Sequence, residues 1–214
     1  VKNKKVVELG CGSAFLAEEI IKLGATSYTG YDISENAINR AIRLSIEKNY
    51  DEKTNFFAKS ILETPLLDAD YVFSLGLTDW LDDNELNHLF KISKNSENLH
   101  SISEDKKSFS QLLHKIYVFL SYARKTKGYA PRYLNSDKIS ELIKFNTGKK
   151  VFKYRNKHMS LGILLSTLPI DASTGFFSKN SNFKNSFLSH SLKPKFLFGT
   201  ISTRLPTKKG FIAP

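Results

Sequence analysis

The chain has 214 residues, a formal net charge of +11, a pI of about 9.6 and a single cysteine. This length suits one domain with a full hydrophobic core plus a tail. The single cysteine excludes an internal disulfide, no apolar run reaches the ~18 residues of a membrane span, and no Cys/His cluster has metal-ligand spacing. We therefore expect a cytoplasmic protein with no transmembrane segment and no metal.

The first predicted element is a strand that ends in a glycine turn. Residues 6–14 read VVELGCGSA, in which an apolar run containing Glu8 is followed by Gly10 and Gly12. Residues 13–23 then have an amphipathic helical pattern. Glycine accepts positive φ and lets the backbone approach a ligand closely, and a helix N-terminus offers free N–H groups. Such a turn at the edge of a parallel sheet is where nucleotide-like cofactors bind.

A second strand is predicted over residues 27–33, and Asp32 lies at its end. The acid follows the glycine turn by about twenty residues, the position at which an open α/β sheet binds ribose hydroxyls. The alternative is that Asp32 or Ser34 caps the next helix. A dinucleotide site is disfavoured because Phe15 occupies the place of its third glycine.

The remaining elements alternate between strands and helices. They are a helix at 35–48, strands at 54–61 and 71–75, a helix near 86–92, a strand at 98–103, helices at 109–123 and 136–145, and a final hairpin of 149–156 and 158–168. The strand at 71–75 is nearly continuous in apolar residues, which is typical of a strand buried on both faces of a parallel sheet. The alternation predicts an α/β fold with a mostly parallel sheet.

The glycine turn resembles the first motif of class I S-adenosylmethionine-dependent methyltransferases, E/D-x-G-x-G-x-G. Ala14 replaces the last glycine, which we expect to cost little because only bulk is excluded there. The resemblance covers roughly residues 4–168. It implies a Rossmann-like seven-stranded, mostly parallel sheet with a C-terminal antiparallel hairpin and helices on both faces. It also implies S-adenosyl-L-methionine as cofactor, and a lid of one or more helices before the first strand that the chain as given lacks.

The resemblance also implies a set of cofactor contacts. The ribose would bind Asp32, the next residue would pack on the adenine, and residues beyond the third strand would touch the adenine edge, where many members carry an acid and this chain does not. Cys11 is expected to be a small filler rather than a catalytic thiol. The cofactor-binding residues are therefore predicted to be Glu8, Gly10, Cys11, Gly12, Asp32, Ile33, Ser60, Ile61 and Leu75.

Two segments are candidates for the acceptor site. The loop after the fourth strand would face the methyl group, where Asp79 acts as a catalytic residue and Trp80 binds substrate. The alternative is that this region only caps a helix, through Asp82 or Asp83, and buries the tryptophan. The amino-group signature [DN]-P-P-[YF] is absent.

The second candidate is an insertion at 104–135, where family members build a substrate lid. His114 is a possible general base because its pKa lies near neutrality, or else a surface residue. Tyr129, Arg132 and Tyr133 are candidate substrate contacts. Arg132 suits a carboxylate or phosphate because of its planar fork, or it pairs with a local acid.

Three functions remain open. The first is methyl transfer to oxygen or nitrogen of a small-molecule acceptor by in-line displacement. The second is an RNA or protein methyltransferase, which the basic charge supports. The third is a degenerate, non-catalytic binding domain, and the helix at 109–123 could lie on a membrane surface, although core packing explains its apolar stripe as well.

The domain is expected to span residues 1–168. The tail, 169–214, holds six Lys and one Arg against one Asp, and its polarity predicts disorder.

Overall fold

The computed structural model describes residues 1–106, 111, 116, 132–155 and 162–169. The strands are β1 (Lys5–Leu9), β2 (Ser27–Asp32), β3 (Thr54–Ala58), β4 (Tyr71–Ser74), β5 (Glu97–Ser103), β6 (Phe152–Tyr154) and β7 (Gly162–Ser166). The helices are α1 (Ala17–Lys22), α2 (Glu35–Glu47), α3 (Asp83–Ile92) and α5 (Ser136–Thr147), with short 3₁₀ turns η1 (Asp51–Lys53), η2 (Ile61–Glu63) and η3 (Thr78–Trp80). None of these helices has the length and apolar character that crossing a membrane requires.

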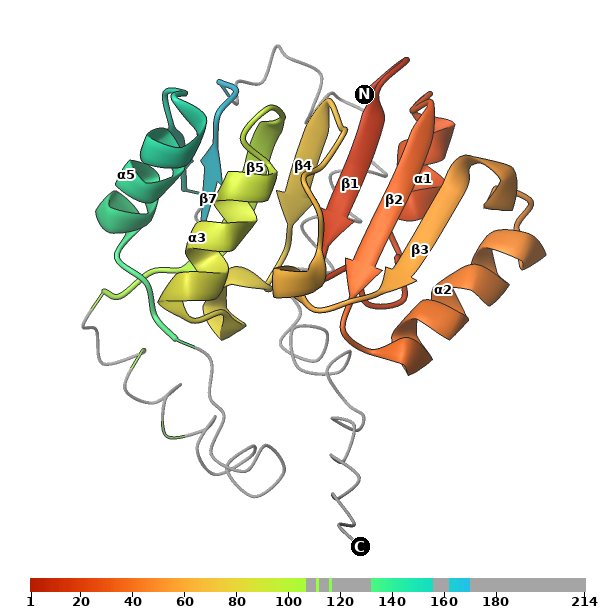
Figure 1. Ribbon diagram of the computed structural model, residues 1–214, viewed down its shortest axis with the longest axis horizontal. Coiled ribbons are helices and arrows are strands. Elements are labelled where there is room, and N and C mark those ends of the chain that lie inside the picture. The colour runs from red at the N-terminus through yellow and green to blue at the C-terminus, as the bar shows by residue number, and fades with distance from the viewer. Residues whose placement is uncertain (107–110, 112–115, 117–131, 156–161, 170–214) are drawn as a thin grey trace, which may run out of the picture.

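The strands form one sheet in the order β3-β2-β1-β4-β5-β7-β6 (Figure 1). The neighbours from β3 to β5 are parallel, and β7 is antiparallel to both β5 and β6. The order reverses between β1 and β4, and ligands of open α/β sheets bind beyond the carboxyl ends of the strands at such a point. The predicted seven-stranded, Rossmann-like fold with a C-terminal hairpin is confirmed.

Alternate residues of each strand point to opposite faces of the sheet, and both faces are apolar. Val6 of β1 belongs to a core cluster with α1 and α2 residues such as Ile20 and Ile38. Val7 belongs to a second cluster with α3 and α5 residues such as Phe90. Helices therefore cover both faces, and they leave the strand ends between them as the place for a ligand.

The first helix begins later than the sequence predicted. Residues 13–16 lie outside it, because Gly12 and Ala14 have φ of +54° and +52° and a right-handed helix cannot include such residues. Ala14 thus replaces a glycine where the backbone is left-handed, and a non-glycine residue costs roughly 1–2 kcal/mol there. The expectation that only side-chain bulk matters at position 14 was therefore wrong, because the left-handed backbone also favours glycine there.

Other boundaries also differ. The predicted strand at 54–61 ends at Ala58, because Ser60 and Glu63 form a capping box that starts η2. The hairpin strands are shorter than 149–156 and 158–168. Apart from residues 111 and 116, the helix expected at 109–123 lies outside the described residues, as does the tail beyond residue 169.

A buried histidine joins β4 to β5. The His100 side chain is fully buried, with Nδ1 2.9 Å from Ser74 Oγ and Nε2 3.0 Å from Asn98 Oδ1. The Asn98 amide nitrogen donates to backbone carbonyls of Ser93 and Ser96, which fixes its oxygen toward the ring. His100 therefore donates through Nε2 and accepts from the Ser74 hydroxyl. Burial lowers the pKa of His100 to about 3, so the ring is neutral.

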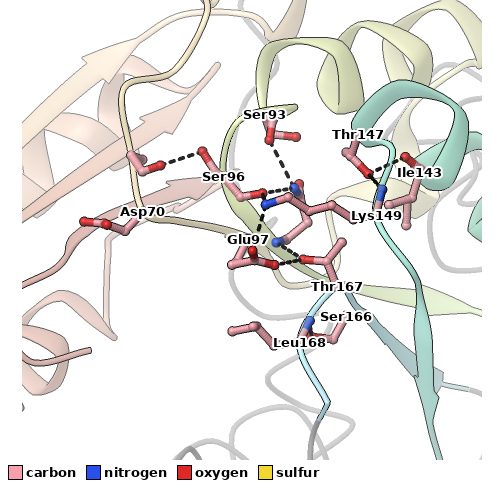
Figure 2. Close-up of polar contacts among 12 residues, drawn as sticks. Asp70, Ser93, Ser96, Glu97, Ile143, Thr147, Lys149, Ser166, Thr167 and Leu168 are labelled. Atoms are coloured by element: carbon pink, nitrogen blue, oxygen red, sulfur yellow. Dashed lines mark hydrogen bonds and ion pairs between the residues drawn. The ribbon is translucent and has the colours of Figure 1, made fainter.

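The polar network continues to the end of the sheet (Figure 2). The backbone N–H of Asn98 donates to Thr167 Oγ1 over 2.8 Å, and that hydroxyl donates to the Glu97 carboxylate over 2.5 Å. Lys149, just after α5, binds the other oxygen of Glu97 at 2.8 Å. These contacts tie the β7 terminus and the α5 terminus to the start of β5.

We expect Ser74→Ala to lower the free energy of unfolding by about 1–3 kcal/mol, because it leaves the buried acceptor nitrogen of His100 without a donor. Chemical denaturation at pH 7 measures this change. Ser140→Ala is the matched control, because that half-buried hydroxyl donates only to the Ser136 carbonyl of its own helix. Equal effects of the two substitutions would contradict the role assigned to the Ser74–His100 bond.

Candidate cofactor and acceptor site

The glycine turn, residues 10–14, bends sharply at the end of β1. The N–H groups of Gly10 and Cys11 both donate to the Tyr31 carbonyl of β2, over 2.8 and 3.0 Å. Gly10 has φ of +71°, and a Cβ there would lie 2.9 Å from Leu77 Cβ. A Cβ on Gly12 would meet no atom within 4 Å. The first glycine is thus required by packing, whereas the second borders open space in which a ligand can approach the backbone.

Asp32 connects this turn to the start of α2. Its Oδ2 accepts from the Gly12 N–H over 2.8 Å, and its Oδ1 accepts from the Ser34 N–H over 2.8 Å. Ser34 itself is the N-cap of α2, since its hydroxyl accepts from Ala37. Each oxygen of a carboxylate has two lone pairs, so Asp32 retains the capacity to accept from a ligand diol.

The predicted adenine contacts differ in exposure. Ile33 is 62% exposed although it is a large apolar side chain, and it directly follows Asp32. Ile61 is only 9% exposed and belongs to the core on the α3 side. Ser60 caps η2, and Leu75, just beyond β4, is half-buried. Ile33 is therefore the member of this group that offers an open apolar surface.

These features fit a nucleoside cofactor. A carboxylate with spare acceptor capacity suits ribose hydroxyls, the open space at Gly12 suits close backbone approach, and the exposed Ile33 suits the face of a base. Asp32 and Ile33 follow β2 and Gly12 follows β1, so all three lie at the carboxyl edge of the sheet.

Glu8, two residues before the glycine turn, is buried rather than open to the site. It is 5% exposed, and its carboxyl accepts a hydrogen bond from the hydroxyl of Tyr28, which is fully buried. Burial raises the pKa of Glu8 to about 8, and the nearby charge of Asp32 adds to this rise. The carboxyl is therefore largely protonated at neutral pH in the absence of a ligand.

Cys11 fills the space between the turn and β2. Its Sγ would lie 2.7 Å from a Cβ placed on Gly30, so the two positions pack as a cysteine and a glycine. Burial raises the pKa of the thiol far above its ordinary range, so it stays protonated. Cys11 is therefore packed filler and not a reactive thiolate.

The loop after β4, residues 75–80, is fastened to β5. The Gly76 N–H donates to Ser101 Oγ over 2.8 Å, and the Thr78 hydroxyl donates to the Ser101 carbonyl over 2.5 Å. The N–H and hydroxyl of Ser103 each donate to one oxygen of the Asp79 carboxylate, both over 2.7 Å. The loop is thus held in a fixed position beyond the sheet edge.

Asp79 is 9% exposed, and burial raises its pKa to about 6. Burial raises the pKa of Tyr133 and the charge of Asp79 adds to it, which places the phenol near the carboxylate. The backbone N–H of Arg132 donates to the Asp79 carbonyl over 2.7 Å. The structure therefore brings together Asp79, Arg132 and Tyr133 from two distant segments, and half-buried Trp80 directly follows Asp79.

The side chain of Arg132 is engaged locally. Its guanidinium donates to the Leu81 carbonyl over 2.9 Å and pairs with Asp83 at 2.5 Å. Of the two alternatives, pairing with a local acid is what the structure shows. Asp82 is the N-cap of α3, as the helix-capping alternative expected. His114 and Tyr129 lie outside the described residues.

Tyr28 and Ser103 hold the buried carboxyls of Glu8 and Asp79, and the sequence reasoning missed both. Tyr28 reaches Glu8 across paired strands, and Ser103 reaches Asp79 because the loop after β4 folds back onto β5. Neither contact follows from the spacing of these residues along the chain. In the β1–β2 register, Val6 lies opposite Tyr28 and Glu8 opposite Gly30. This register places Tyr28 on the same face as Glu8, two residues back on the adjacent strand.

Comparison with known families identifies the domain. Residues 6–95 match the family model described as "Methyltransferase domain". The chain therefore carries a class I S-adenosylmethionine-dependent methyltransferase domain, as the glycine-turn motif indicated.

Among curated proteins, the chain is similar to ribosomal protein L11 methyltransferases. The protein of Shewanella woodyi is 49% identical over 47 residues, which is 22% of this chain and 16% of that protein. The protein of Haemophilus influenzae (strain PittEE) is 39% identical over 80 residues, with 31% of this chain and 27% of that protein covered. The chain thus spans well under a third of the length of the curated relatives it matches.

Among solved structures, the fold is similar to magnesium protoporphyrin IX methyltransferase of Synechocystis PCC 6803 with bound SAH. The TM-score is 0.60 at 17% identity, covering 77% of this chain and 74% of that chain. An O-methyltransferase family protein of Burkholderia thailandensis gives a TM-score of 0.59 at 14% identity, covering 76% and 50%. At these identities the likeness is one of fold.

We expect the free energy of unfolding, without ligand, to fall by roughly 1.5 kcal/mol between pH 6.5 and 8, with a slope that is at most about 1.4 kcal/mol per pH unit and flattens toward the native pKa of Glu8. Glu8 has a native pKa of about 8 against an ordinary 4.5, so the native state binds the proton more tightly and loses stability as pH rises through this window.

Urea denaturation at several pH values measures this slope, and Glu8→Gln should flatten it. His100 gives a smaller change of opposite sign near pH 6.5, because it is neutral in the native state but titrates at its ordinary value of 6.5 once unfolded, so the difference between the native protein and Glu8→Gln isolates the contribution of Glu8. A slope that is the same in the native protein and in Glu8→Gln would show that another group causes it.

Proposed function

We propose that the protein transfers the methyl group of S-adenosylmethionine to oxygen or nitrogen of a small-molecule acceptor. The observation that carries the proposal is the bond between the Gly12 N–H and the Asp32 carboxylate. It joins the glycine turn to the acid that follows β2, so that both can contact one nucleoside. The catalytic unit would span residues 1–168, apart from the basic tail, in the cytoplasm.

In this proposal each residue of the cofactor side has a separate task. Asp32 accepts from the ribose hydroxyls, and Gly12 allows the ligand close to the backbone. Ile33 packs on the adenine face, while Ser60 and Leu75 line its edge and the neighbouring strand end, and Ile61 supports them from the core. Gly10, Cys11 and Glu8 act indirectly, because they set the shape of the turn.

The cofactor supplies an activated methyl group on a positively charged sulfur. The acceptor lone pair forms the new bond to carbon, the electron pair of the broken carbon–sulfur bond stays on sulfur, and the acceptor proton leaves to a base or to water. The protein contributes mainly proximity and alignment. The rigid loop at 75–80 positions the acceptor, with Asp79 as proton acceptor and Trp80 and Tyr133 as walls.

The insertion would complete the acceptor site. We propose His114 as a second candidate base and Tyr129 as a further contact, on the strength of their place in that segment. Arg132 acts as a brace rather than as an anion receptor, since its guanidinium is already paired with Asp83. The brace holds the Asp79 backbone through the Arg132 N–H.

A protein acceptor is the second candidate. It is supported by the short stretches of identity to ribosomal protein L11 methyltransferases and by the net charge of +11, which suits a polyanionic ribosomal environment.

We expect Gly12→Ala to weaken S-adenosylmethionine binding at least tenfold, because its Cβ would enter the space that the ligand needs. Gly148→Ala is the matched control, because Gly148 also has positive φ, at +69°, and open space around its Cβ, but lies at the end of α5. Calorimetric titration measures both affinities. Equal losses would mean that backbone strain, not occupied space, causes the effect.

Methyl transfer itself is tested with S-adenosylmethionine that carries a tritiated methyl group. The native protein should label a metabolite extract, and Asp79→Asn should reduce the rate about 10²–10⁴-fold, the range for loss of a general base. Label in ribosomal protein L11, but not in the small-molecule fraction, would establish the second candidate. Folded, cofactor-binding protein that labels neither fraction would favour the non-catalytic domain.

A further inference from the structure

Glu8 has no chemical task in the proposed mechanism. Burying an ionised carboxyl nevertheless costs free energy unless a cation or hydrogen-bond donors compensate it. The groups that face Glu8 are the Tyr28 hydroxyl from β2, the Cys11 thiol from the turn, and the Asp32 carboxylate at the end of β2. Tyr50 faces Tyr28 from beyond α2. All of these are neutral or negative, and the ion pairs of the described residues do not include Glu8.

The cofactor and its product differ in charge at one atom. S-adenosylmethionine has a sulfonium, and S-adenosylhomocysteine has a neutral thioether after the methyl group has left. The sulfur is bonded to C5′ of the ribose, so a ribose held by Asp32 places it within one nucleoside length of that carboxylate. Asp32 is bonded to the Gly12 N–H of the glycine turn, and the buried Glu8 carboxyl, two residues before that turn, interacts electrostatically with both Asp32 and Cys11, so a sulfonium bound at the turn would lie near Glu8.

We propose that Glu8 is a proton switch that distinguishes the charged cofactor from its neutral product. The carboxyl gives up its proton when S-adenosylmethionine binds and takes one back once the sulfur is neutral. This inference rests on the proposed function, because it requires the cofactor to occupy the glycine turn.

The physical basis is that the described residues give Glu8 no cationic partner, and the sulfonium of S-adenosylmethionine would supply one. A sulfonium near the turn favours the ionised form of Glu8, since an opposite charge within a few ångströms stabilises a carboxylate. The Tyr28 hydroxyl already donates to the carboxyl and can stabilise the anion. When the sulfur is a neutral thioether, no positive charge stabilises the Glu8 anion. Burial then again raises the pKa of Glu8 to about 8, and the carboxyl is largely protonated at pH 7.

The switch has a consequence for turnover. Binding that releases one proton strengthens by up to tenfold for each pH unit between the free and bound pKa values. The affinity for S-adenosylmethionine should therefore rise from pH 6 to pH 8 relative to that for S-adenosylhomocysteine. The ionised Glu8 would hold the charged cofactor, and its reprotonation after methyl transfer would remove that attraction and favour release of the product.

The experiment is calorimetric titration of the full chain with each ligand at pH 7, in two buffers of different ionisation enthalpy, which counts protons released. The α-amino group of each ligand can also titrate near this pH, so Glu8→Gln supplies the background for each. That substitution keeps an oxygen for Tyr28. Glu47→Gln, an exposed change on α2, is the matched control.

For S-adenosylmethionine, the native protein and Glu47→Gln should release about half a proton or more beyond Glu8→Gln. For S-adenosylhomocysteine, the three proteins should agree. Proton counts for S-adenosylmethionine that are the same in native protein and Glu8→Gln would overturn the inference while leaving the proposed function intact.

Binding of neither ligand to the folded native protein would instead overturn the proposed function. If Glu8→Gln fails to fold, Tyr28→Phe provides the second test. It removes the hydrogen bond that lowers the pKa of Glu8, so it should shift the pH at which S-adenosylmethionine affinity rises to a higher value. An unshifted profile would also overturn the inference.

Discussion

The hydrogen bond between the Gly12 N–H and the Asp32 carboxylate is the constraint on which the rest of the site depends. It connects the end of β1 to the end of β2 over 2.8 Å, at the edge of the sheet where the strand order reverses next to β1. Ser34 fixes the other oxygen of the same carboxylate. One acid therefore sets the distance between the turn and the start of α2, and with it the width of the nucleoside site.

The loop at 75–80 is a second rigid unit, on the acceptor side of the proposed site. Four hydrogen bonds fasten the loop at 75–80 to Ser101 and Ser103 of β5. The buried bond between Ser74 and His100 fixes the end of β4, from which the loop departs. The acceptor side is therefore built on the core strands. A methyl transfer that depends on alignment requires this kind of preorganisation.

The sequence predicted the fold, because the relevant signals are local. The period of the apolar residues, the glycine turn and Asp32 each determine a strand, a turn or a helix start within a few residues. The boundary at Ala14 failed because its positive φ is not visible in the sequence, whereas the capping box at Ser60 is an S-x-x-E pattern that was included in the predicted strand.

The site was predicted less completely, because its decisive contacts join distant segments. Tyr28 and Ser103 reach Glu8 and Asp79 through strand register and loop return, which spacing along the chain does not reveal. The pairing of Arg132 with Asp83 likewise depends on where the insertion rejoins the sheet. Burial of Ile61 and exposure of Ile33 are also properties of packing, although both are isoleucines beside predicted strand ends.

The measurement that tests the central claim most directly is calorimetric titration of S-adenosylmethionine into the full chain and into Asp32→Ala. Asp51→Ala, an exposed change in η1, is the control. We expect micromolar binding to the native protein and the control, and loss of that binding in Asp32→Ala. Absence of heat from the folded native protein, or equal affinity in Asp32→Ala, would contradict it.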